Sequence, residues 1–133
     1  MKVNNRDTEY HPVLLLWPDS GGNTTTEDEV DFAESTSDKS QVKFFLHYGS
    51  AGSTTQTSAA KTLDMTVYHN YAVDWSPSGV RGYIDGQLWF TDTTASHNPN
   101  QPMHQGIQLD WFPDGTTTTT STMTVDWTRA YAP

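Results

Sequence analysis

Glu29-Val30-Asp31-Phe32-Ala33-Glu34 is the stretch that decides the fold, because three carboxylates are spaced within an otherwise apolar run. Its Val, Phe and Ala favour a β-strand, and turn-forming residues flank it, Gly-Gly-Asn at 21–23 and Ser-Thr-Ser at 35–37. In a regular strand, alternation would place Glu29 and Asp31 on one face and Glu34 on the other. One extra residue, a β-bulge at Phe32-Ala33, would return Glu34 to the face of Glu29. The stretch therefore predicts a bulged strand with three carboxylates on one side of a sheet.

Three neighbouring carboxylates indicate acid–base chemistry. Like charges at close range push pKa values apart, so one group can hold a proton while another is ionised. Glycoside hydrolysis requires this combination of one carboxylic acid and one carboxylate. The spacing leaves two alternatives open, an acidic patch on an exposed strand and half of a metal site.

The composition favours a water-exposed β-protein and excludes several other classes. The chain has 133 residues, which suits one domain, and 34% are hydrophobic, with Thr, Ser, Asn and Gly abundant. A net charge of −9 argues against nucleic acid as a partner, because phosphate binding needs Lys and Arg. Cys is absent, which excludes disulfides and thiolate metal sites. The longest apolar run, 12–17, has the length of a buried strand, so no membrane-crossing segment is expected.

Further strands are predicted where apolar and aromatic residues lie between turn signals. They are expected at 13–17, 41–48, 71–75, 80–84, 87–91, 103–111 and 123–131, with a two-residue hairpin at Asp85-Gly86. Loops are expected at 18–28, 50–60, 92–102 and 116–120, and residues 1–10 show no strand pattern. If strand 41–48 pairs with the carboxylate strand, His47 would lie near Glu34 and could bind substrate or tune its pKa. The alternative is a surface histidine without a role.

The hexapeptide at 29–34 resembles the catalytic pattern of glycoside hydrolase family 16, which includes laminarinases and other endo-acting β-glucanases and galactanases. A second block is an independent match, Tyr-Ala-Val-Asp-Trp-Ser-Pro at 71–77 followed by Tyr-Ile-Asp-Gly at 83–86. His-Tyr-Gly at 47–49 and the segment 123–131 are also similar to the family, so the resemblance covers about residues 10–131. It implies an all-β fold, an antiparallel β-sandwich of the jelly-roll, concanavalin-like type. It also implies that residues 1–133 form a single catalytic domain that lacks the family's usual N-terminal strands.

The resemblance further implies a retaining endo-glycosidase that cleaves internal bonds of a β-1,3- or β-1,3-1,4-glucan through a glycosyl-enzyme intermediate. Glu29 would be the nucleophile, Glu34 the acid/base, and Asp31 would hydrogen-bond the nucleophile between them. Substrate-binding side chains are expected on the same face, and the candidates are Trp17, His47, Tyr48, Gln108 and Trp111.

Other functions remain open, namely a non-catalytic carbohydrate-binding module and an inactive fragment of such a hydrolase. The expected partner is a polysaccharide, with neither nucleic acid nor a membrane. No cofactor is required, although the resemblance implies that Asp126 could bind a structural Ca²⁺. Open sheet edges could pair between copies and form a homo-oligomer. We expect a secreted protein. Residues 1–5 are polar, unlike a signal peptide, so a signal has been removed or the chain starts inside a longer precursor.

Overall fold

The chain folds almost entirely into β-strands in a computed structural model that describes residues 1–4, 7–20, 28–36, 40–50, 52–53 and 55–131. Within these residues the strands are β1 (Lys2–Asn4), β2 (Tyr10–Pro18), β3 (Glu29–Glu34), β4 (Gln41–Tyr48), β5 (Thr55–Thr62), β6 (Tyr71–Ser76), β7 (Gly79–Ile84), β8 (Gln87–Asp92), β9 (Met103–Trp111) and β10 (Thr122–Thr124). A single 3-10 turn, η1 (Ala95–His97), precedes β9 in this part of the chain. None of the described helical structure is long and apolar enough to span a membrane.

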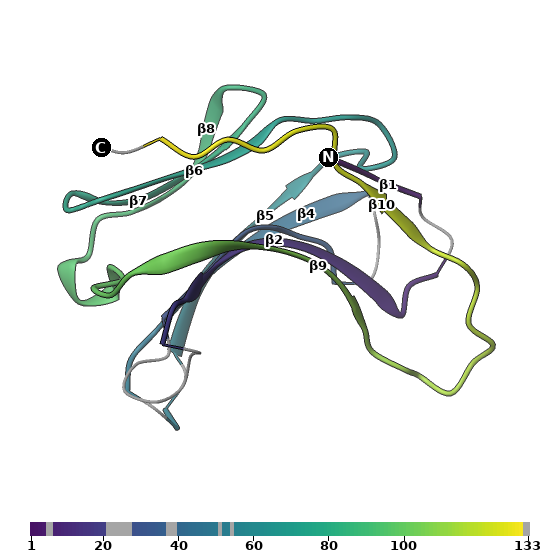
Figure 1. The fold of residues 1–133 in the computed structure, drawn as a ribbon, viewed down its shortest axis with the longest axis horizontal. Coiled ribbons are helices and arrows are strands. Elements are labelled where there is room, and N and C mark those ends of the chain that lie inside the picture. The colour runs from purple at the N-terminus through teal and green to yellow at the C-terminus, as the bar shows by residue number, and fades with distance from the viewer. Residues whose placement is uncertain (5–6, 21–27, 37–39, 51, 54, 132–133) are drawn as a thin grey trace.

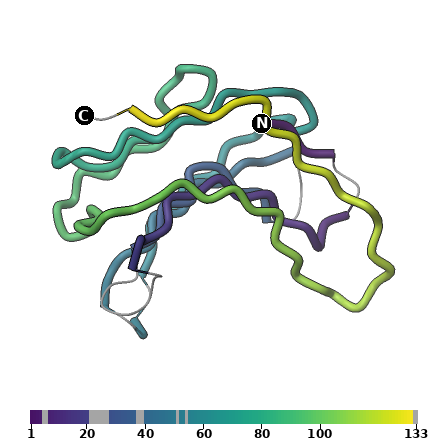
Figure 2. The backbone as a smooth tube through the Cα atoms, in the orientation of Figure 1, coloured from purple at the N-terminus to yellow at the C-terminus, as the bar shows by residue number. Residues whose placement is uncertain are grey.

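The strands form two layers. The large sheet has the order β5-β4-β3-β2-β9 and the small sheet has the order β6-β7-β8, with antiparallel neighbours throughout. The large sheet is bent into an arch, and β6, β7 and β8 lie on its convex side (Figure 1). The C-terminal segment, yellow in Figure 2, runs along the layer of the small sheet. This arrangement confirms the predicted antiparallel β-sandwich.

The hydrophobic core lies between the two layers and follows from strand alternation. In β4, Val42, Phe44 and Leu46 are fully buried, whereas the residues between them are half-buried on the opposite face. The Phe44 ring stacks on Phe90 of β8, with ring centroids 3.9 Å apart. Stacking and burial of such rings supply much of the packing energy of a sandwich. One face of the large sheet is therefore committed to the core, which leaves its concave face for polar side chains.

The hairpin between β7 and β8 turns at Asp85-Gly86, as predicted. Both residues have positive φ, 51° for Asp85 and 76° for Gly86, which is the requirement of a type I′ turn. Asp85 also accepts hydrogen bonds from the Asn70 amide at 2.8 Å and lies 2.7 Å from His69 Nδ1. The turn thereby ties the small sheet to the segment that leads into β6.

Three predictions for the chain outside the catalytic strand are wrong. Residues 1–10 do contain a strand, because β1 pairs with β10 (Lys2 opposite Thr124), and β2 already begins at Tyr10. Most of the predicted loop 50–60 is β5, an edge strand whose side chains are largely exposed but whose backbone pairs along the whole of β4. The predicted strand 123–131 is paired only at Met123 and Thr124, and residues 125–131 line a cavity of about 800 Å³ that β6 also lines. Backbone pairing at an edge leaves no apolar pattern in the sequence, which explains the missed strands.

Other predicted features are confirmed, lie outside the described residues or stay predictions. The strands predicted at 41–48 and 103–111 have the predicted bounds, and Tyr71, Val73 and Trp75 share the less exposed face of β6. The turn residues at 21–23 and 37–39 lie outside the described part of the chain. β5 and β9 are the edges of the large sheet. The predicted homo-oligomer and the single domain over residues 1–133 stay predictions.

We predict that Gly82→Ala destabilises the protein, because a Cβ at Gly82 would lie 2.6 Å from the Phe44 ring. Overpacking of this kind typically costs about 1–3 kcal/mol. Urea denaturation measures the loss, and Phe44→Leu provides a second background with more room. The loss of stability in the double variant Phe44→Leu/Gly82→Ala should be smaller than the sum of the losses in the two single variants. Additive losses would show that the Phe44 contact is not the cause.

Candidate active site

The carboxylate strand contains the predicted bulge. Between Asp31 and Glu34, β3 advances three residues while β4 advances two, since Asp31 pairs with Phe45 and Glu34 with Lys43. On the other side the extra residue lies between Asp31 and Ala33, which pair with the consecutive Leu15 and Leu14 of β2. The added residue reverses the alternation and turns Glu34 to the face of Glu29 and Asp31.

The three carboxylates line one pocket on the concave face of the large sheet. The pocket has a volume of about 390 Å³, and strands β2, β3, β4, β5 and β9 contribute to it. Its lining residues are Val13, Glu29, Asp31, Glu34, Phe45, His47, Gln56, Asp110 and Phe112. The clustering of Glu29, Asp31 and Glu34 predicted from the sequence is therefore present in the structure.

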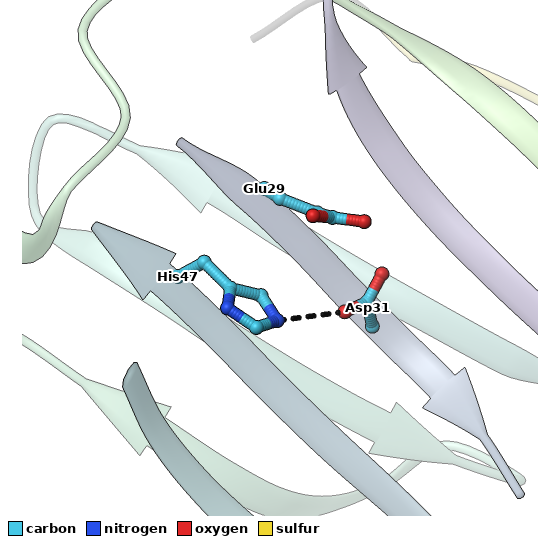
Figure 3. A group of neighbouring side chains, drawn as sticks. All are labelled: Glu29, Asp31 and His47. Carbon is cyan, nitrogen blue, oxygen red and sulfur yellow. Dashed lines mark hydrogen bonds and ion pairs between the residues drawn. The ribbon is translucent and has the colours of Figure 1, made fainter. Parts of the chain in front are cut away.

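His47 enters the pocket from β4, where it is opposite Glu29 in the register. Its Nε2 lies 3.2 Å from Asp31 Oδ2, as Figure 3 shows. The hydrogen bond with Asp31 raises the pKa of His47, although burial opposes this shift. The prediction that His47 reaches the carboxylate cluster is confirmed, and its direct partner is Asp31 rather than Glu34.

The second oxygen of Asp31 indicates a shared proton. Asp31 Oδ1 is buried and accepts no hydrogen bond from a described protein donor. Figure 3 shows the Glu29 carboxyl group directed toward Asp31, and acidic oxygens of the two residues lie within 4.8 Å of each other. A buried acceptor without a donor is costly, and one proton between the two carboxyls would satisfy it. A protonated Glu29, whose pKa is raised, can therefore donate this hydrogen bond to Asp31 Oδ1.

Burial controls the ionisation of both glutamates. Desolvation, followed by the charge of Asp31, raises the pKa of Glu29 from 4.5 to about 8. The same two causes, in the same order, raise the pKa of Glu34 from 4.5 to about 7, with Lys43 and His47 opposing them. Near neutral pH, Glu34 thus exchanges its proton readily, which is the property of a group that acts as both acid and base.

Glu29, Asp31 and His47 are also close enough together to be considered as ligands of one metal ion. Possible ligand atoms of Glu29, Asp31 and His47 lie within 4.8 Å of one another. The imidazole nitrogen that would face an ion is already hydrogen-bonded to Asp31, and the raised pKa of Glu29 favours its neutral form. Because a metal needs an unprotonated imidazole and ionised carboxylates, the arrangement fits proton chemistry better than metal binding.

The predicted substrate-binding residues divide between two faces. Trp17 is two residues from Leu15, and Gln108 is two residues from Asp110, so alternation places both on the pocket face. Neither side chain lines the pocket itself. Tyr48 was placed wrongly: it packs against the core and stacks on His97 at 3.6 Å, because it follows His47 and so points to the opposite side.

Trp111 was also placed wrongly. It follows the pocket residue Asp110, so alternation turns its indole away, and Nε1 donates a 3.2 Å hydrogen bond to Glu9. Phe112 lines the pocket instead. Sequence alternation alone could have assigned Phe45 and Asp110 to this face, whereas Gln56 could not be found because β5 had no strand pattern.

Asp126 lies away from the pocket in the exposed C-terminal segment. Among the described residues it belongs to no group of three Asp, Glu or His side chains placed to share an ion. Burial lowers the pKa of the Met1 amino group while Asp126 opposes the shift, so the ammonium group is a close cation for this carboxylate. The calcium ion expected at Asp126 stays a prediction.

Comparison with known proteins gives consistent results. The family model described as "Glycosyl hydrolases family 16" matches residues 10–129. The beta-glucanase of Bacillus amyloliquefaciens is 34% identical over 70 residues, covering 53% of this chain and 29% of that protein. The beta-glucanase of Bacillus subtilis (strain 168) is 34% identical over 74 residues, with 52% and 28% covered. The chain thus matches less than a third of the length of these curated relatives.

Solved structures show the same similarity. A Bacillus licheniformis beta-glucanase superposes with a TM-score of 0.60 at 25% identity, over 83% of this chain and 50% of that one. The laminarinase catalytic domain of Thermotoga maritima MSB8 superposes with a TM-score of 0.66 at 17% identity, over 87% and 55%. At that identity the second likeness shows the fold alone.

We predict that Glu34→Gln makes the protein more stable than the wild type at pH 8. The folded protein holds the Glu34 proton up to about pH 7, whereas an unperturbed glutamate releases it near 4.5. Glu34 therefore lowers the free energy of unfolding of the wild type as pH rises through this window, by on the order of 1–2 kcal/mol, and the variant lacks this contribution. Denaturant unfolding at pH 5 and pH 8 measures the difference. Asp74→Asn, at an exposed carboxylate of β6, is the control, and parallel pH curves for Glu34→Gln and wild type would contradict the prediction.

Proposed function

This chain belongs to glycosyl hydrolase family 16, and we propose that it cleaves internal β-1,3- or β-1,3-1,4-glucan bonds with retention of configuration. The observation that carries the proposal is the bulge in β3. It places Glu29 and Glu34 on one face with Asp31 between them, in one pocket. Retention calls for roughly 5–5.5 Å between the two carboxyl groups, and without the bulge Glu34 would be on the wrong side of the sheet.

In the first step, Glu29 attacks the anomeric carbon and Glu34 gives its proton to the departing glycosidic oxygen. The C–O bond to the leaving sugar breaks as the ester bond to Glu29 forms. In the second step, Glu34, now a carboxylate, takes a proton from water while that water's oxygen displaces Glu29 from the sugar. Both carboxyl groups return to their starting states, so the cycle is balanced.

Asp31 and His47 support this chemistry through the proton of the Glu29–Asp31 pair. The nucleophile must be ionised, so the proton between the two carboxyl groups has to leave Glu29 before the attack. His47 beside Asp31 Oδ2 orients the carboxyl group, which leaves Oδ1 to hydrogen-bond Glu29. A cationic His47 also lowers the pKa of both glutamates, which favours the ionised nucleophile.

The proposed substrate class follows from similarity and from the pocket lining. The relatives described above are named as beta-glucanases and a laminarinase. A neutral polysaccharide suits a chain of net charge −9, and the rings of Phe45 and Phe112 offer apolar surface for the C–H faces of sugar rings. An extracellular location is proposed because a polysaccharide substrate would be encountered outside the cell. Catalysis needs no cofactor in this proposal. A calcium ion at Asp126 would be structural, and unfolding temperatures with EDTA and with added calcium test for it.

We predict that the wild type releases new reducing ends from laminarin or mixed-linkage β-glucan. A panel of these glucans and galactans, assayed for reducing sugar, is the measurement. Asp74→Asn is the matched control and should retain activity, because this exposed carboxylate of β6 lies on the small sheet. Binding to glucan without turnover would favour a carbohydrate-binding module, and neither binding nor turnover would favour an inactive fragment.

We predict that Glu29→Ala and Glu34→Ala lose activity on the order of a hundredfold or more but fail at different steps. With an activated β-glycoside, Glu34→Ala should still form the glycosyl-enzyme, because a good leaving group needs no acid. Added azide should intercept this intermediate and give the β-glycosyl azide. In Glu29→Ala, azide should attack directly from the opposite face and give the α-azide. NMR of the products distinguishes the anomers, and the reverse pattern would exchange the two roles.

A further inference from the structure

A second histidine contacts the proposed acid/base from the neighbouring strand. His11 of β2 lies two residues before Val13, which is opposite Glu34, so its side chain is on the pocket face. Its Nδ1 lies 3.8 Å from Glu34 Oε1, and both side chains are 15% exposed. The pair is therefore partly removed from water. A charge interaction in such a place is stronger than one on an open surface.

Phe112 backs this histidine. The Phe112 and His11 rings stack with centroids 4.4 Å apart and an interplanar angle of 30°. Phe112 is in turn fixed through the buried Glu9. The backbone carbonyl of Glu9 accepts the Phe112 amide at 2.8 Å, and its carboxylate accepts Trp111 Nε1 and the Asp114 amide. The Phe112 ring is thus held over His11 by hydrogen bonds of Phe112 itself and of residues before and after it in the chain.

The other charged groups around Glu34 come from three strands. Asp31 of β3 and Asp110 of β9 raise its pKa, while Lys43 and His47 of β4 lower it. Lys43 is opposite Glu34 in the register, but its ammonium group lies over the Phe45 ring, 5.8 Å from the centroid. His47 bonds to Asp31. His11, on β2, is a cationisable side chain with a ring nitrogen within ion-pair distance of Glu34 itself.

We propose that His11 is a positioning residue for Glu34: backed by Phe112, it orients the carboxyl group and stabilises its ionised form. This inference rests on the proposed function, in which Glu34 gives up a proton in the first step and regains one from water in the second. Between these steps Glu34 is a carboxylate in a partly desolvated pocket beside Asp31. A protonated His11 offsets that charge, and the stacked Phe112 keeps the imidazole in place and limits its exposure to water.

The test measures the ionisation of Glu34 directly, by ¹³C NMR titration of its side-chain carboxyl in wild type, His11→Gln and His11→Lys. In His11→Gln the titration midpoint of Glu34 should rise by about one pH unit, because a cationic neighbour is lost. In His11→Lys, which keeps a cation, the midpoint should be at or below that of the wild type. Phe112→Ala should raise it in the same direction by less.

His104→Gln is the matched control. His104 is also on the pocket face of the large sheet and also pairs with a carboxylate, Asp19, at 2.8 Å, but far along β9 from Asp110. Its substitution should leave the Glu34 midpoint unchanged. An unchanged midpoint in folded His11→Gln overturns the inference. If His11→Gln does not fold, a midpoint in His11→Lys above the wild-type value overturns it, and one at or below that value supports it.

Activity gives a second readout that separates this inference from the proposed function. If the wild type hydrolyses glucan, the basic limb of the pH profile of kcat/KM should shift to higher pH in His11→Gln, together with the NMR midpoint. A merely structural loss would not cause this shift. If the wild type hydrolyses no glucan, the proposed function fails, while the NMR titration still decides whether His11 controls the ionisation of Glu34.

Discussion

One extra residue in β3 is the constraint on which the rest of the site depends. A sheet has two faces, and the core occupies one of them through Val30, Phe44 and Leu46. In a regular strand of six residues, the first and last side chains lie on opposite faces, so one of the two glutamates would point into that core. The bulge after Asp31 buries both Phe32 and Ala33 and returns Glu34 to the concave side. Packing and chemistry are therefore satisfied by the same irregularity.

The pocket obtains its chemistry from desolvation more than from any one charge. Burial is the first cause of the raised pKa of both Glu29 and Glu34, and Asp31 is the second. Histidines of two strands moderate this acidic cluster, with His47 against Asp31 and His11 against Glu34. The cost of burying carboxylates is thus partly offset within the pocket itself, and what remains keeps protons mobile near neutral pH.

The position of Phe112 links the site to a distant part of the chain. Glu9, just before β2, holds the end of β9 through its carbonyl and its carboxylate. Asp7 similarly accepts the backbone amide of Thr119 and so anchors the segment after Phe112. These buried acidic residues do not line the pocket, yet their hydrogen bonds help to position Phe112, which does line it. A substrate-facing surface is thereby set by hydrogen bonds made behind it.

The sequence by itself determined the antiparallel strands with clear alternation, the Asp85-Gly86 hairpin, the bulge and the carboxylate cluster. These features depend on local geometry, because side-chain period, turn φ values and one odd spacing are written in consecutive residues. Only the tertiary structure decided that β5 and β1 are strands, since polar edge strands are specified by the backbone of a neighbour. It also decided that Tyr48 and Trp111 face away, while Phe112 lines the pocket and the His11 ring lies close to Glu34. Which ring meets which carboxylate depends on the register between β2, β3 and β9, and that register is set by contacts far apart in the chain.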